Sequence, residues 1–174
     1  MSESCCVPRP AQQPVIATAG ACPQCGQKGK SVQHVTLQSL LLVDLRLLQA
    51  DAYRFCRTPG CPVAYFAADG SETFTVEQVR VPIWQKQPAT TTLICYCFKW
   101  TPTRIRDELV LTGASSVIDQ INAGIKAGLC ACEITNPQGS CCLGNVRAAV
   151  AAVENELGVA GDEQAALNET VCIS

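Results

Sequence analysis

The sequence has 174 residues and a formal net charge of −2, and hydrophobic residues make up 48% of it. This composition excludes wholesale disorder, allows one domain or two small ones, and provides no basic surface for a nucleic-acid backbone. No apolar run reaches the roughly 18 to 20 residues that span a bilayer, and residues 1–21 lack a basic segment followed by a continuous apolar one. We therefore expect a cytosolic protein that neither binds nucleic acid nor inserts into a membrane.

Cysteine is the unusual residue type, with 13 cysteines against a single histidine. Thiols stay reduced in the cytosol, so this density indicates metal or redox chemistry rather than a disulfide framework. With one histidine, any metal site must consist almost entirely of thiolates. We expect that histidine, His34, to be a partly exposed strand residue without a catalytic role.

The chain divides by composition into two small units. Residues 1–20, which include Cys5 and Cys6, are expected to form a disordered N-terminal segment, and residues 21–84 a first unit. Residues 85–92, the polar and threonine-rich QKQPATTT, are typical of a linker. Residues 93–158 form the second unit, and residues 159–174, with Cys172, are expected to be a flexible tail.

Two closely spaced cysteine pairs mark the first unit. ACPQCGQKG holds a C-x2-C pair and FCRTPGCPVAYF a C-x4-C pair. Each pair can form a knuckle in which glycine or proline lets the backbone fold round an ion, so together they can supply a tetrahedral zinc site. Four thiolates leave zinc no open coordination position, which favours a structural role over a labile sensing or copper-exchange site. The predicted zinc ligands are Cys22, Cys25, Cys56 and Cys61.

The other segments of residues 21–84 predict a zinc-ribbon-like module. VQHVTLQSLL and ADAYRF have the composition of strands or short helices, and VAYFAADGSETFTV is typical of a hairpin that turns at Asp69-Gly70. A module of this size has a small core, so we expect its folding to depend on the metal.

Residues 93–158 predict three short helices. TPTRIRDELVLTG has a threonine N-cap followed by proline and ends at Gly113, and SSVIDQINAGIKAG ends at Gly128. LGNVRAAVAAVENELG carries valines at helical spacing. The fold class is therefore α+β, with a zinc-ribbon-like module that contains β-strands followed by a small helical domain.

Cysteines precede and follow the first two of these helices. LICYCFKW holds a C-x-C pair, and CACEITNPQGSCC holds four cysteines between residues 130 and 142. A [2Fe-2S] cluster needs four thiolates, two on each iron, and two facing cysteine segments can supply them. The helices thus predict a site at which these segments meet.

These motifs resemble two known families. A C-x-C, about thirty intervening residues and a second cysteine pair are similar to the bacterioferritin-associated-ferredoxin-like (BFD-like) [2Fe-2S] domain. The closer resemblance is to the N-terminal region of the CopZ-type copper chaperones. There a zinc module with C-x2-C and C-x4-C knuckles precedes a C-x-C, and the later loop ends in C-x3-N-P-x-G-x-C-C, which stands here from Cys132 to Cys142. This resemblance covers about residues 20–157.

The resemblance implies the cluster ligands, with one member of the pair Cys141-Cys142 among them. We favour Cys142, because it lies just before the third helix, near free backbone N–H groups and the positive end of the helix dipole. Cys141 in its place, and Cys130 in place of Cys132, stay open. The Asn-Pro-x-Gly segment is expected to shape the loop and donate backbone hydrogen bonds to sulfur. The implied [2Fe-2S] ligands are Cys95, Cys97, Cys132 and Cys142.

The resemblance also implies a function in copper or other soft-metal homeostasis. A protein of this kind would carry one electron, for example to reduce Cu(II) to Cu(I) for a copper-transporting P-type ATPase or a separate copper chaperone. The alternatives are a thiol-rich module that binds Cu⁺, or one that senses or assembles a cluster.

Two features of the sequence separate it from a complete chaperone and from an enzyme. No C-x2-C follows Cys142, so we expect the heavy-metal-associated domain of those chaperones to be lacking. The sequence shows no catalytic dyad and no nucleotide-binding glycine loop, which leaves a metal-ion reductase activity at most. The oligomeric state is open.

Overall fold

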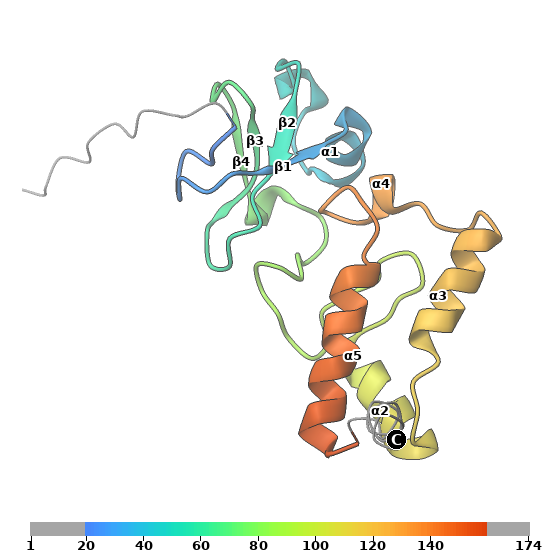
Figure 1. Ribbon diagram of the computed structural model, residues 1–174. Helices are drawn as coiled ribbons and strands as arrows, with labels where there is room; N and C mark the ends of the chain where they lie inside the picture. Colours follow the sequence, from blue (N-terminus) through green and yellow to red (C-terminus); the bar gives the residue numbers. More distant parts are fainter. Residues whose placement is uncertain (1–19, 160–174) are drawn as a thin grey trace, which may run out of the picture.

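The computed structural model describes residues 20–159 and has the predicted α+β class. An antiparallel sheet of four strands in the order β1-β2-β3-β4 forms one end of the molecule, and helices form the other (Figure 1). Residues 1–19 of the predicted N-terminal segment and residues 160–174 of the predicted tail, with Cys5, Cys6 and Cys172, lie outside the described residues. The strands are β1 (Lys30–Val32), β2 (Tyr53–Phe55), β3 (Val63–Ala67) and β4 (Thr73–Thr75).

Strand β3 is buried along its whole length, because both of its faces are covered. On one face, Leu37 of helix α1 (His34–Leu40) joins Tyr53 and Tyr65 in a core of aromatic and aliphatic side chains. On the other face, Phe66 packs with cysteines of the two knuckles. Alternation of side chains along a strand thus sends neighbouring residues of β3 into two different environments.

The turn between β3 and β4 is the predicted hairpin. Gly70 has φ +82° and its N–H donates to the Ala67 carbonyl at 2.9 Å, while the Asp69 carboxylate accepts from the Ser71 N–H. Two short 3-10 helices, Leu45–Leu47 and Val76–Gln78, complete this half.

The predicted strand at His34 is wrong, because His34 is the exposed first residue of α1. Thr36, Leu37 and Leu40 are buried at helical spacing, so a helix buries more apolar surface there than a strand would.

The second half contains the three predicted helices and one additional helical turn. Thr101 Oγ1 accepts from the Arg104 N–H at 3.2 Å at the start of the first helix, which ends at Gly113 with φ +77°. A core of apolar side chains, including Ile105, Ile121 and Val146, joins the long helices. The helices are α2 (Pro102–Thr112), α3 (Val117–Lys126), α4 (Cys132–Thr135) and α5 (Leu143–Leu157).

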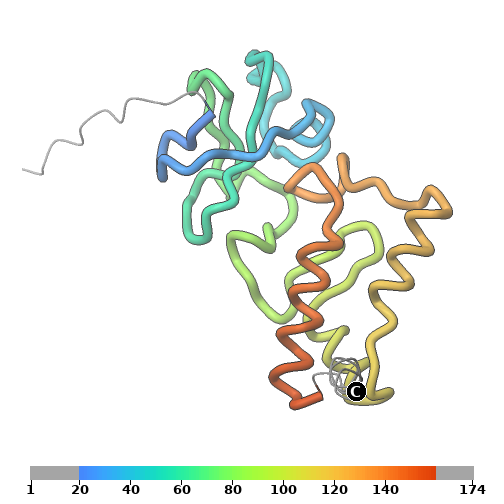
Figure 2. Tube along the Cα trace, in the orientation of Figure 1, coloured from blue at the N-terminus to red at the C-terminus, as the bar shows by residue number. Residues whose placement is uncertain are grey.

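The short α4 and the residues after it lie between the sheet half and the long helices, where α4 contacts α1. Figure 2 shows the segment after β4 running from the sheet to the side of α5. In the predicted linker, Lys86 and Thr92 are buried, and Lys86 Nζ donates to the Thr58 carbonyl at 3.0 Å. The domain boundaries stay a prediction. Among the described residues, no helix combines the length and the hydropathy that a membrane span requires.

Candidate metal centres

The first candidate centre is formed by the two knuckles at the edge of the sheet. Two cysteines precede β1, one follows β2 directly, and one lies two residues before β3. The four sulfur atoms all lie within 4.8 Å of one another. Cys22 Sγ is 3.9 Å from Cys61 Sγ, and Cys25 Sγ is 3.6 Å from Cys56 Sγ. A tetrahedron of sulfurs about 2.3 Å from zinc has edges of about 3.8 Å, so the quartet fits this ion.

Backbone turns at glycine give the knuckles their shape. Gly26 and Gly60 both have φ +71°, a left-handed conformation that glycine adopts without a steric penalty. The Gly26 N–H donates to the Cys22 carbonyl at 2.8 Å, and the Cys61 N–H to the Thr58 carbonyl at 3.3 Å. These turns point the thiols of each pair to one side.

The thiols of the quartet differ in acidity. Burial raises the pKa of Cys22 to about 12. For Cys25, burial raises the pKa, but the opposing effect of hydrogen bonds with the Thr58 hydroxyl and the Gln27 backbone outweighs it. The resulting pKa of Cys25 is lowered to about 6. A largely buried quartet of this kind requires a compensating positive charge before all its thiols can ionise, and a bound Zn²⁺ would supply that charge.

The second candidate centre lies where the C-x-C segment meets the four-cysteine loop. Cys97 Sγ is 4.0 Å from Cys130 Sγ and 3.8 Å from Cys132 Sγ, and the last two are 3.4 Å apart. The Ala131 N–H donates to Cys97 Sγ at 3.3 Å, and the Thr135 hydroxyl lies 3.1 Å from the same sulfur. The sulfur of Cys97 is therefore both close to two other thiols and hydrogen-bonded by the loop.

Two further cysteines, Cys95 and Cys142, are buried in the same core as Cys132. A hydrogen bond with the Cys142 thiol lowers the pKa of Cys95 to about 7 and the pKa of Cys132 to about 5. The same two neighbours raise the pKa of Cys142, which is 1% exposed. Cys141, by contrast, is exposed.

The structure thus groups two of the predicted cluster ligands, Cys97 and Cys132, with Cys130. It places Cys95 and Cys142 in the same buried core as Cys132, outside that group of three, and leaves Cys141 exposed. Cys132 belongs to both sets, because its sulfur lies 3.8 Å from Cys97 Sγ and its side chain is buried in the core that contains Cys95 and Cys142. Cys142 is the N-cap residue of α5, as expected, but its side chain makes no capping hydrogen bond. Five cysteines in or against one core offer enough soft sulfur donors for an iron–sulfur cluster, which needs four.

A network of side-chain amides holds the loop after α4, and the sequence motif indicates only part of this network. Asn136, which is 1% exposed, accepts from the Gln138 N–H and donates to the Ser140 carbonyl at 2.8 Å. Gln138 Nε2 donates to the carbonyls of Ser140 at 3.1 Å and Cys141 at 2.7 Å. The motif predicted a role for the asparagine, but Gln138 stands at its variable position.

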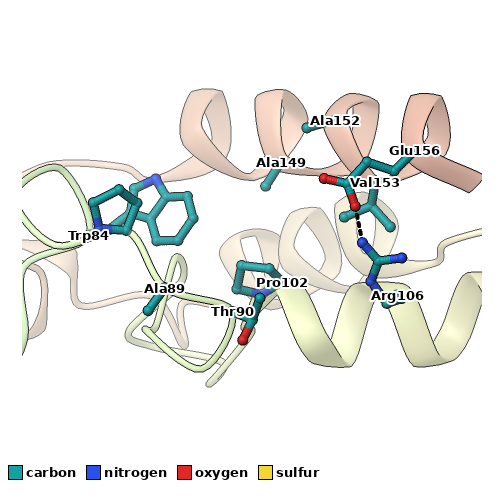
Figure 3. Close-up of a pocket in the computed structure, with 10 residues that line it drawn as sticks. Trp84, Ala89, Thr90, Pro102, Arg106, Ala149, Ala152, Val153 and Glu156 are labelled. Carbon is teal, nitrogen blue, oxygen red and sulfur yellow. Dashed lines mark hydrogen bonds and ion pairs between the residues drawn. The ribbon is translucent and has the colours of Figure 1, made fainter.

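An apolar cavity of about 290 Å³ lies between α2, α5 and the segment before α2 (Figure 3). Trp84 and Pro102 contribute to its wall, and an ion pair between Arg106 and Glu156 lies at its edge. Its lining contains no cysteine, so we assign it no part in either metal centre.

Comparison with known proteins matches the first half to a family. Residues 19–80 match the zf_CopZ family, whose description is a zinc binding domain. The copper chaperone CopZ of Archaeoglobus fulgidus is 25% identical over 122 residues, which are 70% of this chain and 57% of the chaperone. This chain therefore spans little more than half of that relative's length. Residues 19–80 are thus similar to the zinc binding domain of that family.

One solved structure extends the similarity to the second half of the fold. The X-ray structure of the Archaeoglobus fulgidus CopZ N-terminal domain has a TM-score of 0.61 and 23% identity, and the match covers 74% of this chain and 95% of that one. The comparisons support the predicted resemblance to the N-terminal region of CopZ-type copper chaperones. The BFD-like [2Fe-2S] part of that resemblance stays a prediction.

Proposed function

We propose that this chain is a cytosolic metalloprotein that carries zinc in its first centre and a [2Fe-2S] cluster in its second, and that it transfers single electrons in the handling of copper or another soft metal. Zinc would be held by the quartet of knuckle cysteines. The cluster would be held by Cys95, Cys97, Cys132 and Cys142, with Cys130 as a fifth thiol beside them.

The observation that carries the proposal is that five cysteines lie in or against one core, three of them with sulfurs within 4.8 Å of one another, beside a separate sulfur quartet. A four-thiolate zinc site has no free coordination position and no redox chemistry, so it favours a structural role. A bound [2Fe-2S] cluster supplies one-electron redox chemistry. Redox function is therefore assigned to the second centre.

Several groups of this chain would tune that centre. The Ala131 N–H and the Thr135 hydroxyl contact Cys97 Sγ, and hydrogen bonds to a ligand sulfur stabilise its negative charge. Cys95 and Cys142 are almost fully buried, whereas Cys97 is half-buried. Electrons would then pass most readily on the side of Cys97 and Cys130.

The link to copper rests on similarity to a protein named as a copper chaperone. We propose that the electron reduces Cu(II) to Cu(I) for a copper-transporting P-type ATPase or a separate copper chaperone.

A second candidate function is the binding of Cu⁺ itself. The triangle formed by the sulfurs of Cys97, Cys130 and Cys132 has edges of 3.4 to 4.0 Å. Three thiolates at this spacing suit a soft monovalent cation.

Analysis of protein purified without oxygen tests the first proposal. We expect zinc, iron and sulfide in proportions near one, two and two per chain, and a rhombic EPR signal that appears on reduction with dithionite. Protein that carries only zinc and stays colourless after anaerobic reconstitution would refute the cluster. Tight Cu⁺ binding by that colourless protein, lost in Cys130→Ser, would favour the second candidate.

A further inference from the structure

Strand β3 lies between the two candidate centres and contacts both. Phe66 packs with the knuckle cysteines Cys22, Cys56 and Cys61. Its neighbour Tyr65 is fully buried on the opposite face, and its hydroxyl donates at 2.7 Å to the carbonyl of Pro137 in the four-cysteine loop. Because successive side chains of a strand point to opposite faces, a displacement of β3 at one centre would also displace the contact that β3 makes at the other.

A second pair of neighbouring residues repeats this arrangement in the segment after β4. Lys86 Nζ donates to the carbonyl of Thr58, whose hydroxyl contacts Cys25 Sγ in the first centre. Gln85 Nε2 donates at 2.6 Å to Gln138 Oε1, in the loop of the second centre. The two centres are therefore joined through two independent pairs of adjacent residues.

The contacts in the loop determine which way its last two cysteines point. Gln138 donates to the Ser140 and Cys141 carbonyls, and Gly139, with φ +63°, lies close against the sheet half. A Cβ at Gly139 would be 3.0 Å from Val32 Cγ1 and 3.0 Å from Thr36 Oγ1, so the loop backbone is fitted to that surface. This placement leaves Cys141 exposed and Cys142 buried.

We propose that Tyr65 and Gln85 are positioning residues through which the zinc centre controls the second centre. With zinc bound, the loop keeps Cys142 buried in the core that contains Cys95 and Cys132, and without zinc the loop detaches from the sheet half and exposes it. This inference rests on the proposed function only in taking the knuckle quartet as the zinc site. The inference implies that zinc must occupy the first centre before the second centre can take up its cluster.

Alkylation of single cysteines in the full chain tests the inference before any cluster is loaded. Reduced, zinc-loaded, iron-free protein is treated with iodoacetamide, and the labelling rates of Cys141 and Cys142 are read separately by peptide mass spectrometry. Tyr65→Phe removes one hydroxyl and keeps the buried ring. We expect it to speed labelling of Cys142 about 2- to 10-fold, the effect of losing one buried hydrogen bond on a local opening.

Tyr53→Phe is the matched control. Tyr53 is fully buried in the neighbouring strand, and its hydroxyl contacts the Ala50 N–H and Glu72 rather than the loop. It should leave the Cys142 rate unchanged. In both variants the exposed Cys141 should be labelled at the wild-type rate. Equal Cys142 rates in the two variants, or equal acceleration of both cysteines in Tyr65→Phe, would overturn the inference.

Removal of zinc with a chelator is the second arm. We expect the labelling rate of Cys142 in the wild-type chain to rise about tenfold or more. In a Tyr65→Phe, Gln85→Met variant the loop is already less firmly held when zinc is bound, so we expect a smaller ratio of zinc-free to zinc-loaded rates. The proposal is contradicted if the labelling rate of Cys142 is the same with and without zinc. It is also contradicted if the ratio of zinc-free to zinc-loaded rates in the double variant equals that of the wild-type chain. Because iron is absent throughout, these results are independent of whether the chain ever takes up a [2Fe-2S] cluster.

Discussion

Two adjacent cysteines in this chain have opposite environments. Cys142 is 1% exposed and lies in the core that contains Cys95 and Cys132, whereas Cys141 is exposed. The difference arises from the backbone between them and Asn136, which is held by side-chain amides instead of regular secondary structure. Neighbouring residues of identical chemistry therefore have different expected functions.

We predict that Cys142→Ser lowers the iron content of anaerobically reconstituted protein by at least about half, because a serine oxygen is a much poorer ligand for iron than a thiolate. Cys141→Ser is the matched control, since its side chain points to solvent. Iron and sulfide per chain are the measurement. If iron is lost only from Cys141→Ser, the prediction is wrong. The loop would then have to rotate on cluster binding so that Cys141, and not Cys142, is the ligand.

The tyrosines provide a prediction for alkaline pH. Burial, as the largest cause, raises the pKa of Tyr53 and of Tyr96 to about 12, and it raises the pKa of Tyr65 as well. A tyrosine in the unfolded chain has a pKa of about 10. The folded state therefore holds these protons more tightly, so their contribution to stability is fully present below pH 10 and is lost as pH rises toward 12.

Absorbance at 295 nm, which reports tyrosinate, measures this effect in the zinc-loaded protein. We expect tyrosinate to appear in one steep step above pH 10 that coincides with unfolding seen by circular dichroism. A gradual titration centred near pH 10 in the still-folded protein would contradict the burial of the three hydroxyls.

At the scale of elements, local signals predicted the long helices and missed the short one. Threonine before proline, and glycine at the far end, determine where α2 begins and ends. Helix α4 has only four residues and begins at Cys132. A helix of this length is too short to show the helical spacing of apolar residues in the sequence. The C-x2-C and C-x4-C spacings likewise indicated a shared site, because short cysteine pairs impose local turns.

Glycines in two helices should respond in opposite ways to the same substitution. A Cβ at Gly124 in α3 would be 2.3 Å from Phe98 Cζ, whereas a Cβ at Gly144 in α5 meets no atom within 4 Å. Overpacking costs about 1–3 kcal/mol, and alanine in a helix gains about 0.5–1 kcal/mol over glycine.

We therefore expect Gly124→Ala to lower the free energy of unfolding by about 1–2 kcal/mol and Gly144→Ala to raise it by about 0.5–1 kcal/mol. The midpoints of urea denaturation of the zinc-loaded variants measure both. Equal shifts of the same sign would mean that Phe98 moves aside without cost.

At the scale of the whole molecule, polar contacts between distant segments join the two halves. Tyr65 and Pro137, or Gln85 and Gln138, are far apart in the chain, and single contacts of this kind leave no periodic pattern or spacing in a sequence. For that reason the sequence indicated two units and a linker, but not the surface by which they pack.

Unfolding of the two halves should therefore be one transition. Both tryptophans of the chain, Trp84 and Trp100, pack against the second core. Their fluorescence thus reports only the second half, while zinc release, followed with a chromogenic chelator, reports the first. We expect the two signals to have the same urea midpoint. Zinc release at clearly lower urea than the fluorescence change would show that the halves unfold separately.

Strand β3 has no residue left facing solvent, and this limits how the chain can be rearranged. A fragment that stops before the segment at residues 85–92 lacks Pro137, so the buried Tyr65 hydroxyl would lose its hydrogen-bond acceptor. One side of the sheet would also become exposed to solvent. A fragment that starts after it would lose the support beneath Pro137. We therefore expect neither half to fold correctly when it is expressed or fused to another protein alone. Gene fusion and domain shuffling would have to transfer both halves together.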